Sequence, residues 1–183
     1  SKFSLLARLF RMTLTTHAVT SLVIAKYLPW PIAAFFVSAF VHYLMDVIPH
    51  GDEFLYWRYI KNKKDKLPLT VAIIDILLML GLCAAFYFLD KTLPWYLVVS
   101  AAVGGILPDL LINLHTQARN RFRNVYIGFG GKLEHVYHRF LQAHYKWHMW
   151  WHYLTKKTIR FRYGVAMQII FLGIVFWYYR FRG

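Results

Sequence analysis

The stretch "PIAAFFVSAFVHYLMDVIPHGDE", residues 31–53, carries the main signal for the fold of this chain. It begins as an unbroken apolar run, typical of a membrane-embedded helix, and ends in groups that ionise or bind metals: His42, Asp46, His50 and Asp52. A helix places His42 and Asp46 on one face because they are four residues apart. Pro49 disfavours helical geometry at the preceding residue. We therefore predict that the helix ends there and that His50 and Asp52 turn back toward the same site.

The composition indicates a membrane protein built of helices. Of the 183 residues, 58% are hydrophobic and 16% are charged, and the mean hydropathy is +0.39. A soluble domain carries about a quarter charged residues. We predict an all-α, polytopic transmembrane helical bundle of about five membrane-embedded helices, since about 20 apolar residues cross a bilayer. A soluble helical bundle is the less favoured alternative. The expected helices cover residues 12–27, 31–48, 67–89, 93–114 and 163–179.

The whole chain, residues 1–183, is expected to form a single membrane domain. Residues 12–50 make a first helical hairpin, 67–114 a second, 115–160 a basic cytoplasmic or interfacial segment, and 163–180 the last helix. Leu28-Pro29-Trp30 precedes the second helix of one hairpin, and Leu93-Pro94-Trp95 precedes that of the other. This pattern indicates a parallel repeat of two hairpins, although such short apolar words also recur by chance.

The net charge of +14 comes from 22 Lys and Arg against 8 Asp and Glu. Basic loops stay in the cytoplasm, so we predict an integral protein of the cytoplasmic (inner) membrane with its N-terminus and basic loops inside. These loops are expected to attract membrane lipids with anionic headgroups. Nucleic-acid binding is not expected because no binding motif is present. The sequence predicts no particular oligomeric state.

Three acidic residues lie within the apolar runs: Asp46, Asp75 and Asp109. A carboxylate in hydrocarbon costs a few kcal/mol and therefore usually faces a cavity, a partner or a metal. At 1.5 Å per residue, these carboxylates and His17 fall at a similar depth on four helices. No Lys or Arg lies inside the second to fourth runs to neutralise them. We predict that one or two divalent ions are held by His17, His42, Asp46, Asp75 and Asp109.

Imidazole and carboxylate ligands together favour zinc, with manganese or iron as alternatives. Two other interpretations compete with a metal. A single intramembrane histidine such as His17 is more often a hydrogen-bonded packing residue, and an aspartate in an apolar helix can be neutralised by protonation.

A second unusual stretch is "LEHVYHRFLQAHYKWHMWWHYL", residues 133–154, with five histidines and three tryptophans. We predict a helix over about residues 132–154 at headgroup level, where Trp is favoured. At 100° per residue, His138, His148 and His152 share one face. One interpretation is a membrane-surface belt whose histidines have no chemical role. The other is a lid over the site that adds His138 or His148 as a ligand or general acid–base.

The chain resembles the bacterial and archaeal membrane-bound metal-dependent hydrolase-like proteins. The resemblance covers about residues 12–115 and rests on Thr15-Thr16-His17, on the spaced element His42, Asp46, Pro49, His50, Asp52, and on Pro108-Asp109. It implies a small multi-spanning helical protein that hydrolyses its substrate with the help of a metal, and it leaves the substrate open.

The leading hypothesis is an integral-membrane metal-dependent hydrolase that acts on a lipid-linked phosphoester near the cytoplasmic leaflet. The expected catalytic residues, beside the metal ligands, are His50, Asp52, His138 and His148. A membrane di-iron oxygenase or desaturase is the first alternative, because such enzymes also use histidine clusters at helix ends; three buried aspartates argue against it. A non-enzymatic lipid-binding or assembly subunit is the second alternative.

Overall fold

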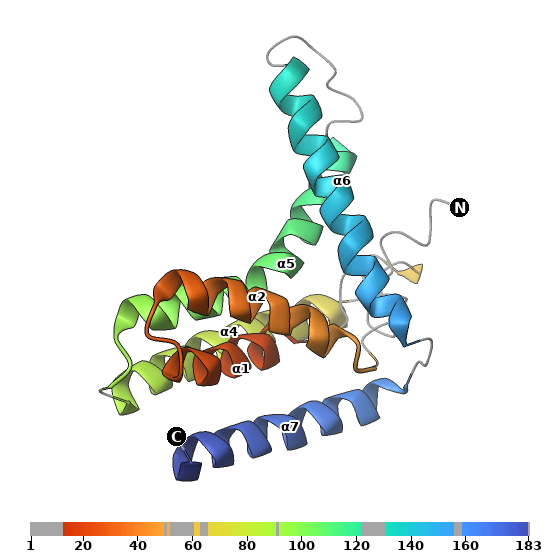
Figure 1. Cartoon of the computed structure of the whole chain (residues 1–183). Helices are drawn as coiled ribbons and strands as arrows, with labels where there is room; N and C mark the ends of the chain where they lie inside the picture. Colours follow the sequence, from red (N-terminus) through yellow and green to blue (C-terminus); the bar gives the residue numbers. More distant parts are fainter. Residues whose placement is uncertain are drawn as a thin grey trace.

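The computed structural model describes residues 13–49, 51, 61–62, 66–90, 92–121, 131–155 and 159–182. Within these residues the chain is all-α, as predicted, and contains six helices and no strand (Figure 1). The helices are α1 (Leu14–Lys26), α2 (Pro31–Asp46), α4 (Leu67–Leu89), α5 (Trp95–Arg121), α6 (Gly131–Leu154) and α7 (Phe161–Arg182).

Prolines and one glycine set several of the helix boundaries. α2 begins at Pro31, where the missing N–H costs no hydrogen bond. It ends at Asp46, so the predicted termination ahead of Pro49 is confirmed. Gly51 follows with a φ of +78°, a conformation that side chains disfavour, and a Cβ there would also crowd the backbone of Arg160. Gly51 therefore lies against the backbone of residues 159–160, just before α7.

The short helix α1 lies at the centre of the bundle and packs against α2, α4, α5 and α7. Its side chains Ala18, Leu22 and Ala25 are completely or almost completely buried. The main apolar core continues from α1 into Ala34 of α2 and Ala101 of α5. Small residues at these contacts let the backbones approach closely, which is how helices pack without a hydrophobic driving force.

Two consecutive glycines bring α5 into close contact with both α1 and α2. A Cβ at Gly104 would overlap the carbonyl of Phe35 in α2. A Cβ at Gly105 would overlap the hydroxyl of Ser21 in α1 and lie 3.0 Å from the carbonyl oxygen of His17. Only glycine allows both approaches, so this pair fixes the spacing of the three helices one turn before Pro108.

In the part of the chain that the structure describes, three helices are long and apolar enough to cross a membrane: Thr70–Leu89 in α4, Trp95–Ile112 in α5 and Phe161–Phe181 in α7. Only 11% of the α4 and α7 segments is buried inside the protein. Contiguous apolar surface of this extent indicates contact with lipid. The sequence predicts about five embedded helices, and length and composition support three. With 13 and 16 residues, α1 and α2 are shorter than the roughly 20 residues of a full span.

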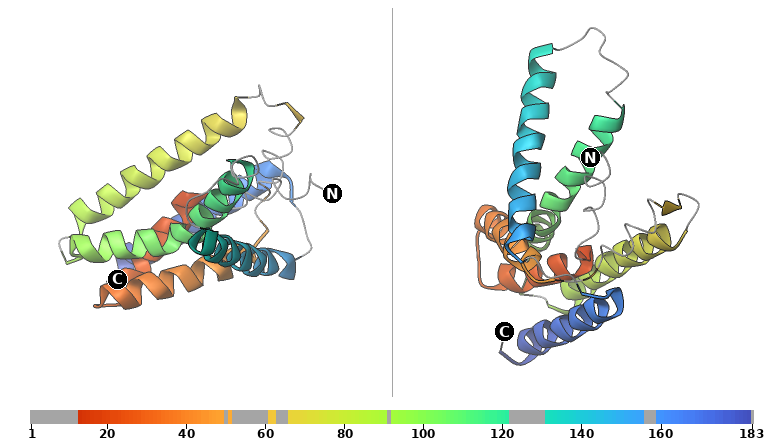
Figure 2. Two further views of the ribbon diagram at one scale, coloured as in Figure 1. Left: turned by 90° about the horizontal axis from the view of Figure 1, so that it is seen from above. Right: turned by 90° about the vertical axis from the view of Figure 1, so that its right-hand side faces the viewer.

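α5 bends at Pro108, and beyond the bend it runs beside α6 (Figure 1). Proline removes one intrahelical hydrogen bond and bends a helix at this point. Two further views show that α6 crosses the end of the bundle steeply instead of joining it as a parallel member (Figure 2). The predicted helix over residues 132–154 is confirmed as α6.

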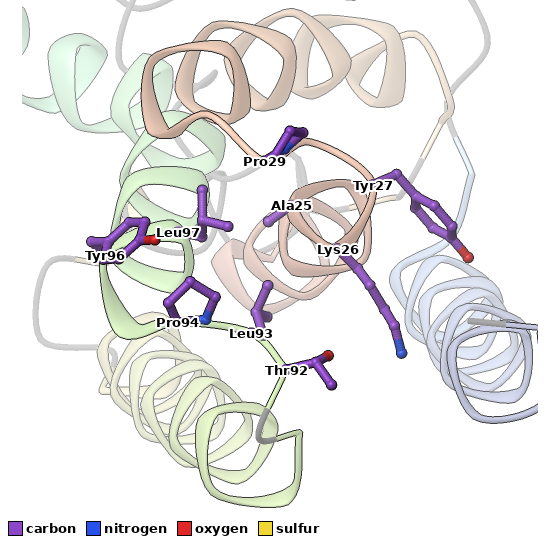
Figure 3. A pocket seen from close by; sticks show the side chains of 9 residues that line it. All are labelled: Ala25, Lys26, Tyr27, Pro29, Thr92, Leu93, Pro94, Tyr96 and Leu97. Atoms are coloured by element: carbon purple, nitrogen blue, oxygen red, sulfur yellow. The ribbon is translucent and has the colours of Figure 1, made fainter.

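The two Leu-Pro-Trp turns lie at the other end of the bundle, on either side of one hollow. Its volume is about 300 Å³, and its lining comes from the α1–α2 turn and the α4–α5 turn (Figure 3). Lys26, whose ammonium lies 3.2 Å from the Asp90 carboxylate, is one of the lining residues. The repeated Leu-Pro-Trp motif therefore occurs in equivalent turns of two hairpins. The polar cluster described next lies at the opposite end of the bundle.

Candidate metal centre

Six ionisable side chains from four helices converge at the bend of α5: His17 from α1, His42 and Asp46 from α2, Asp109 from α5, and His148 and His152 from α6. Four of them belong to the five predicted metal ligands. The tight spacing that Gly104 and Gly105 impose brings α1, α2 and α5 together here. The crossing of α6 adds the last two histidines.

Asp46 lies at the centre of this His/Asp cluster. Its Oδ2 is 2.9 Å from Nε2 of His148 and 3.2 Å from Nε2 of both His42 and His152. Its Oδ1 is 3.4 Å from Nε2 of His17. The Asp46 side chain is only 1% exposed. Four imidazole nitrogens thus surround one buried carboxylate.

Asp109 approaches the same nitrogens from a more open side. Its Oδ1 is 3.7 Å from Nε2 of His42 and 3.7 Å from Nε2 of His148. The Asp109 side chain is 21% exposed, in contrast to Asp46. The cluster therefore has one buried carboxylate and one that solvent or a substrate reaches.

Backbone carbonyls set the orientation of two of the imidazole rings. Nδ1 of His42 donates a hydrogen bond of 2.7 Å to the carbonyl of Gly105, one turn before Pro108. Nδ1 of His152 donates one of 3.2 Å to the carbonyl of Asp46. A carbonyl only accepts, so both rings carry their proton on Nδ1 when neutral. The Nε2 lone pairs of both rings then face the cluster, as in metal-ligating histidines.

Several buried polar atoms of the cluster lack a hydrogen bond to any described residue. These are both ring nitrogens of His17, Nε2 of His42, Oδ2 of Asp46 and Nδ1 of His148. The short N···O separations around Asp46 therefore lack hydrogen-bond alignment. A buried polar atom without a partner costs about 1–3 kcal/mol. Nε2 of His17, Nε2 of His42 and Oδ2 of Asp46 face one another without a hydrogen bond, which indicates a missing common partner.

The separations fit the coordination sphere of a metal ion. With bonds of about 2.1 Å, ligand atoms are about 3.4 Å apart around a tetrahedral ion and about 3.0 Å apart around an octahedral one. The distances of 2.9 to 3.4 Å around Asp46 fall at these values. Among the described residues, two overlapping groups have possible ligand atoms within 4.8 Å of one another: His17, His42 and Asp109, and His42, Asp46 and His148.

His42 belongs to both groups, which limits how many ions they can bind. Its Nδ1 is used by the carbonyl of Gly105, so only Nε2 remains as a ligand. One imidazole nitrogen has one lone pair and binds one ion. The two groups therefore describe alternative parts of a single site.

Asp75, the fifth predicted ligand, has a different role. Its carboxylate accepts hydrogen bonds from the backbone N–H groups of Leu14, at 2.7 Å, and Thr15, at 3.2 Å. These are orphan donors at the N-terminus of α1, which a carboxylate also stabilises through the helix dipole. Asp75 thus caps α1 from α4. Asp75 belongs to neither of the two described ligand groups, and its assignment as a metal ligand stays a prediction.

Gln168 of α7 completes the support of α1. Its Oε1 accepts hydrogen bonds from the backbone N–H of Thr13 at 3.1 Å and from the hydroxyls of Thr13 and Thr16 at 2.7 and 3.2 Å. Thr16 precedes His17, so these bonds hold the first turn of α1 and the histidine it carries in place.

Of the four side chains predicted to be catalytic, the structure describes one, His148. His50 and Asp52 lie outside the described residues, and so does the side chain of His138. His148 belongs to the ligand group itself, close to Asp46. From the sequence, His152 shares a helix face with His148, but it was not predicted as a ligand or catalytic residue. In the structure, Nε2 of His148 and Nε2 of His152 share a hydrogen bond of 2.9 Å.

His144 lies beside the cluster and shares a hydrogen bond of 3.0 Å with the Tyr43 hydroxyl. Burial, followed by the neighbouring His148, His42 and His115, lowers the pKa of His144 to about 4. His144 is therefore neutral at physiological pH and adds no positive charge next to the cluster. Tyr43 in turn packs edge-on against His42 and His148.

Comparison with known proteins gives no family for this chain: no family model, curated protein or solved structure matches it. The resemblance to the membrane-bound metal-dependent hydrolase-like proteins stays a prediction. What the chain does is therefore argued from the geometry of the His/Asp cluster.

Proposed function

We propose that this chain is an integral-membrane metal-dependent hydrolase, and that the His/Asp cluster holds one divalent ion. The observation that carries this proposal is the convergence of four imidazole Nε2 atoms on the buried carboxylate of Asp46, where Nε2 of His17, Nε2 of His42 and Oδ2 of Asp46 have no hydrogen bond to any described residue. His42, Asp46 and His148 are the core ligands, His17 and His152 complete the sphere, and Asp109 lies beside it on the more open side.

Zinc is the favoured ion, because nitrogen-rich sites with a carboxylate suit it well; manganese and iron accept the same ligands. A bound divalent ion supplies two effects: it activates water near neutral pH and polarises a phosphoryl or carbonyl oxygen. Two carboxylates balance the charge of such an ion, which explains why the apolar runs at residues 31–48 and 93–114 carry no Lys or Arg.

The two carboxylates are suited to different tasks. Asp46 is buried and in contact with four histidines, so it holds the ligands together. Asp109 is partly exposed and still reaches the same nitrogens, so it is placed to accept a proton from the attacking water and deliver it to the leaving group. The substrate class that fits a site at the end of a lipid-facing bundle is a lipid-linked phosphoester.

The proposal is tested on full-length protein purified in detergent without chelators. We expect one zinc, manganese or iron ion per chain by elemental mass spectrometry, and release of a phosphorylated product from a lipid mixture by phosphorus NMR. Asp109→Asn should keep the ion and lose the hydrolysis. Protein that binds no divalent ion on titration would refute the metal centre.

A second candidate, an iron-dependent membrane oxygenase, is favoured by the number of histidines. Four imidazoles with two carboxylates exceed the three protein ligands of a catalytic zinc site. The same elemental analysis separates the candidates. Iron in the purified protein, together with a product that forms only in the presence of oxygen, would select the oxygenase over the hydrolase.

A further inference from the structure

Helix α6 has an exposed apolar stripe directly opposite the face that carries the metal-centre histidines. Its buried face is formed by Leu141, Tyr145, His148 and His152. At 100° per residue, the apolar stripe covers an arc of about 80° on the other side. The stripe consists of Val136, Phe140, Ala143, Trp147, Trp150 and Leu154, all exposed.

The stripe is continuous with the apolar outer surface of α2. Trp151, which adjoins it, contacts Phe40 edge-on at 6.2 Å and stacks on Tyr43 at 6.2 Å between ring centroids. Trp147 also contacts Tyr43, at 6.4 Å. Phe40 is an exposed side chain of an apolar helix whose other outer residues, such as Phe36, are exposed too. The apolar surfaces of α2 and α6 are therefore continuous, and the same environment covers both.

Cationic side chains lie along the opposite edge of the stripe. Arg139, Gln142 and Lys146 are exposed and occupy the side of α6 away from Trp151. The helix is thus aromatic on the edge that meets α2, apolar along the stripe and basic on the far edge. This arrangement matches a helix that lies in a bilayer interface, with aromatic side chains toward the hydrocarbon and basic ones among the phosphates.

The direction of α6 agrees with this arrangement. Its steep crossing of the bundle end directs it along the membrane surface when α4, α5 and α7 cross the membrane (Figures 1 and 2). We infer that α6 is an interfacial helix whose apolar stripe inserts into the headgroup region of an anionic leaflet and holds the His/Asp cluster at the depth of lipid phosphate and ester groups. The occupant of the stripe is the bilayer itself.

The membrane position of α6 follows from its own surface, and only the identity of the substrate rests on the proposed hydrolase function. His148 and His152 are on the same helix as the stripe, so the depth of α6 is the depth of the cluster. A phosphoester of a membrane lipid then reaches Asp109 by lateral movement within the leaflet. A soluble phosphoester would have to cross the headgroup layer first.

Two neighbouring residues of α6 give a matched pair for measuring this depth. Ala143 is in the stripe and Gln142 is about 100° away, on the basic edge. In a Cys83→Ser background, Ala143→Cys and Gln142→Cys each carry one nitroxide spin label. The full-length chain is reconstituted in vesicles of phosphatidylcholine with phosphatidylglycerol. Collisions of the label with oxygen, which concentrates in lipid, are compared with collisions with aqueous chromium oxalate.

We expect the ratio of oxygen to chromium oxalate collisions to be several-fold higher at position 143 than at position 142. Replacing Arg139 and Lys146 with Gln should lower the ratio at position 143 in the anionic vesicles. Equal, water-like ratios at both positions would overturn the inference. Spin–spin broadening at position 143 would also overturn it, because a second copy would then cover the stripe. Neither readout depends on bound metal, so failure here is distinguishable from failure of the metal centre.

Discussion

Replacing Asp46 with asparagine tests the metal centre most directly. Asparagine keeps the shape of the side chain and removes one negative charge next to the proposed ion. Asp46 is in contact with the Nε2 atoms of four histidines and is 1% exposed, so water cannot substitute for the lost charge. The variant should therefore lose metal affinity without a change in side-chain volume.

The size of the effect follows from the loss of one partner in a buried charge pair. Removing one such partner typically costs about 3–5 kcal/mol, because the other charge is left buried without compensation. A smaller desolvation cost in the variant offsets part of this loss, which leaves about 3 kcal/mol, or about a hundredfold in affinity. At a zinc concentration about 100 times the dissociation constant of the wild type, zinc stabilises the wild type by about 2.7 kcal/mol and Asp46→Asn by about 0.4 kcal/mol.

The assay is thermal unfolding in detergent, with and without zinc, and Asp75→Asn is the matched control. Asp75 is also a carboxylate in an apolar helix, but it accepts hydrogen bonds from the start of α1. Asp75→Asn should lower the stability of the metal-free protein by about 1–3 kcal/mol and leave the zinc-dependent gain intact. The reasoning is refuted if Asp46→Asn keeps the full zinc-dependent gain, or if Asp75→Asn loses it equally.

Three other variants test the framework around the centre. Gly105→Ala should lower the free energy of unfolding by about 1–3 kcal/mol, because its Cβ overlaps Ser21. Gly81→Ala is the control: its Cβ meets no atom within 4 Å, so the same unfolding assay should show no change. His152→Gln should weaken zinc binding by about 10–100-fold in a competition titration, and an unchanged affinity would remove His152 from the site. Burial raises the pKa of Asp90, but hydrogen bonds from Thr92, Tyr179 and Lys26 outweigh it and hold that pKa well below its usual 3.8. The stabilisation by Asp90 is therefore complete above about pH 4 and disappears as the pH falls through the folded-state pKa. Asp90→Asn should accordingly lower the unfolding midpoint at neutral pH and change it little in strong acid.

The helices were predictable from sequence because each depends on local signals. The apolar run that begins after Lys66 and ends before Asp90 gives α4 with its predicted bounds, residues 67–89. Pro31 and Pro49 frame α2 in the same way. The prediction for the second hairpin ended too early, because α5 continues to Arg121 as a polar helix. Apolar periodicity cannot detect such a helix, which is stabilised by packing beside α6.

The sequence predicts at which depth along the helices the site residues lie, but not in which direction their side chains point. Counting residues along each helix places His17, Asp46, Asp75 and Asp109 at one level, and this holds for Asp75 as well as for the true members of the cluster. The direction in which each side chain points depends on the rotation of its helix, which is fixed by Gly104 and Gly105 and by the contacts of α1. Sequence spacing carries no information on that rotation between helices.

The shortness of α1 explains why two kinds of buried polar groups occur at the same depth. α1 has only 13 residues, and its first turn, half-buried at Leu14 and buried from Thr15, has N–H groups without an intrahelical partner. Asp75 and Gln168 satisfy these donors from two neighbouring helices. The same arrangement carries His17 into the interior, where its ring stacks on His42 at 3.9 Å between centroids. Groups bonded to the backbone of α1 therefore support the fold, whereas Nε2 of His17, Nε2 of His42 and Oδ2 of Asp46, which have no hydrogen bond to any described residue, are left to bind an ion.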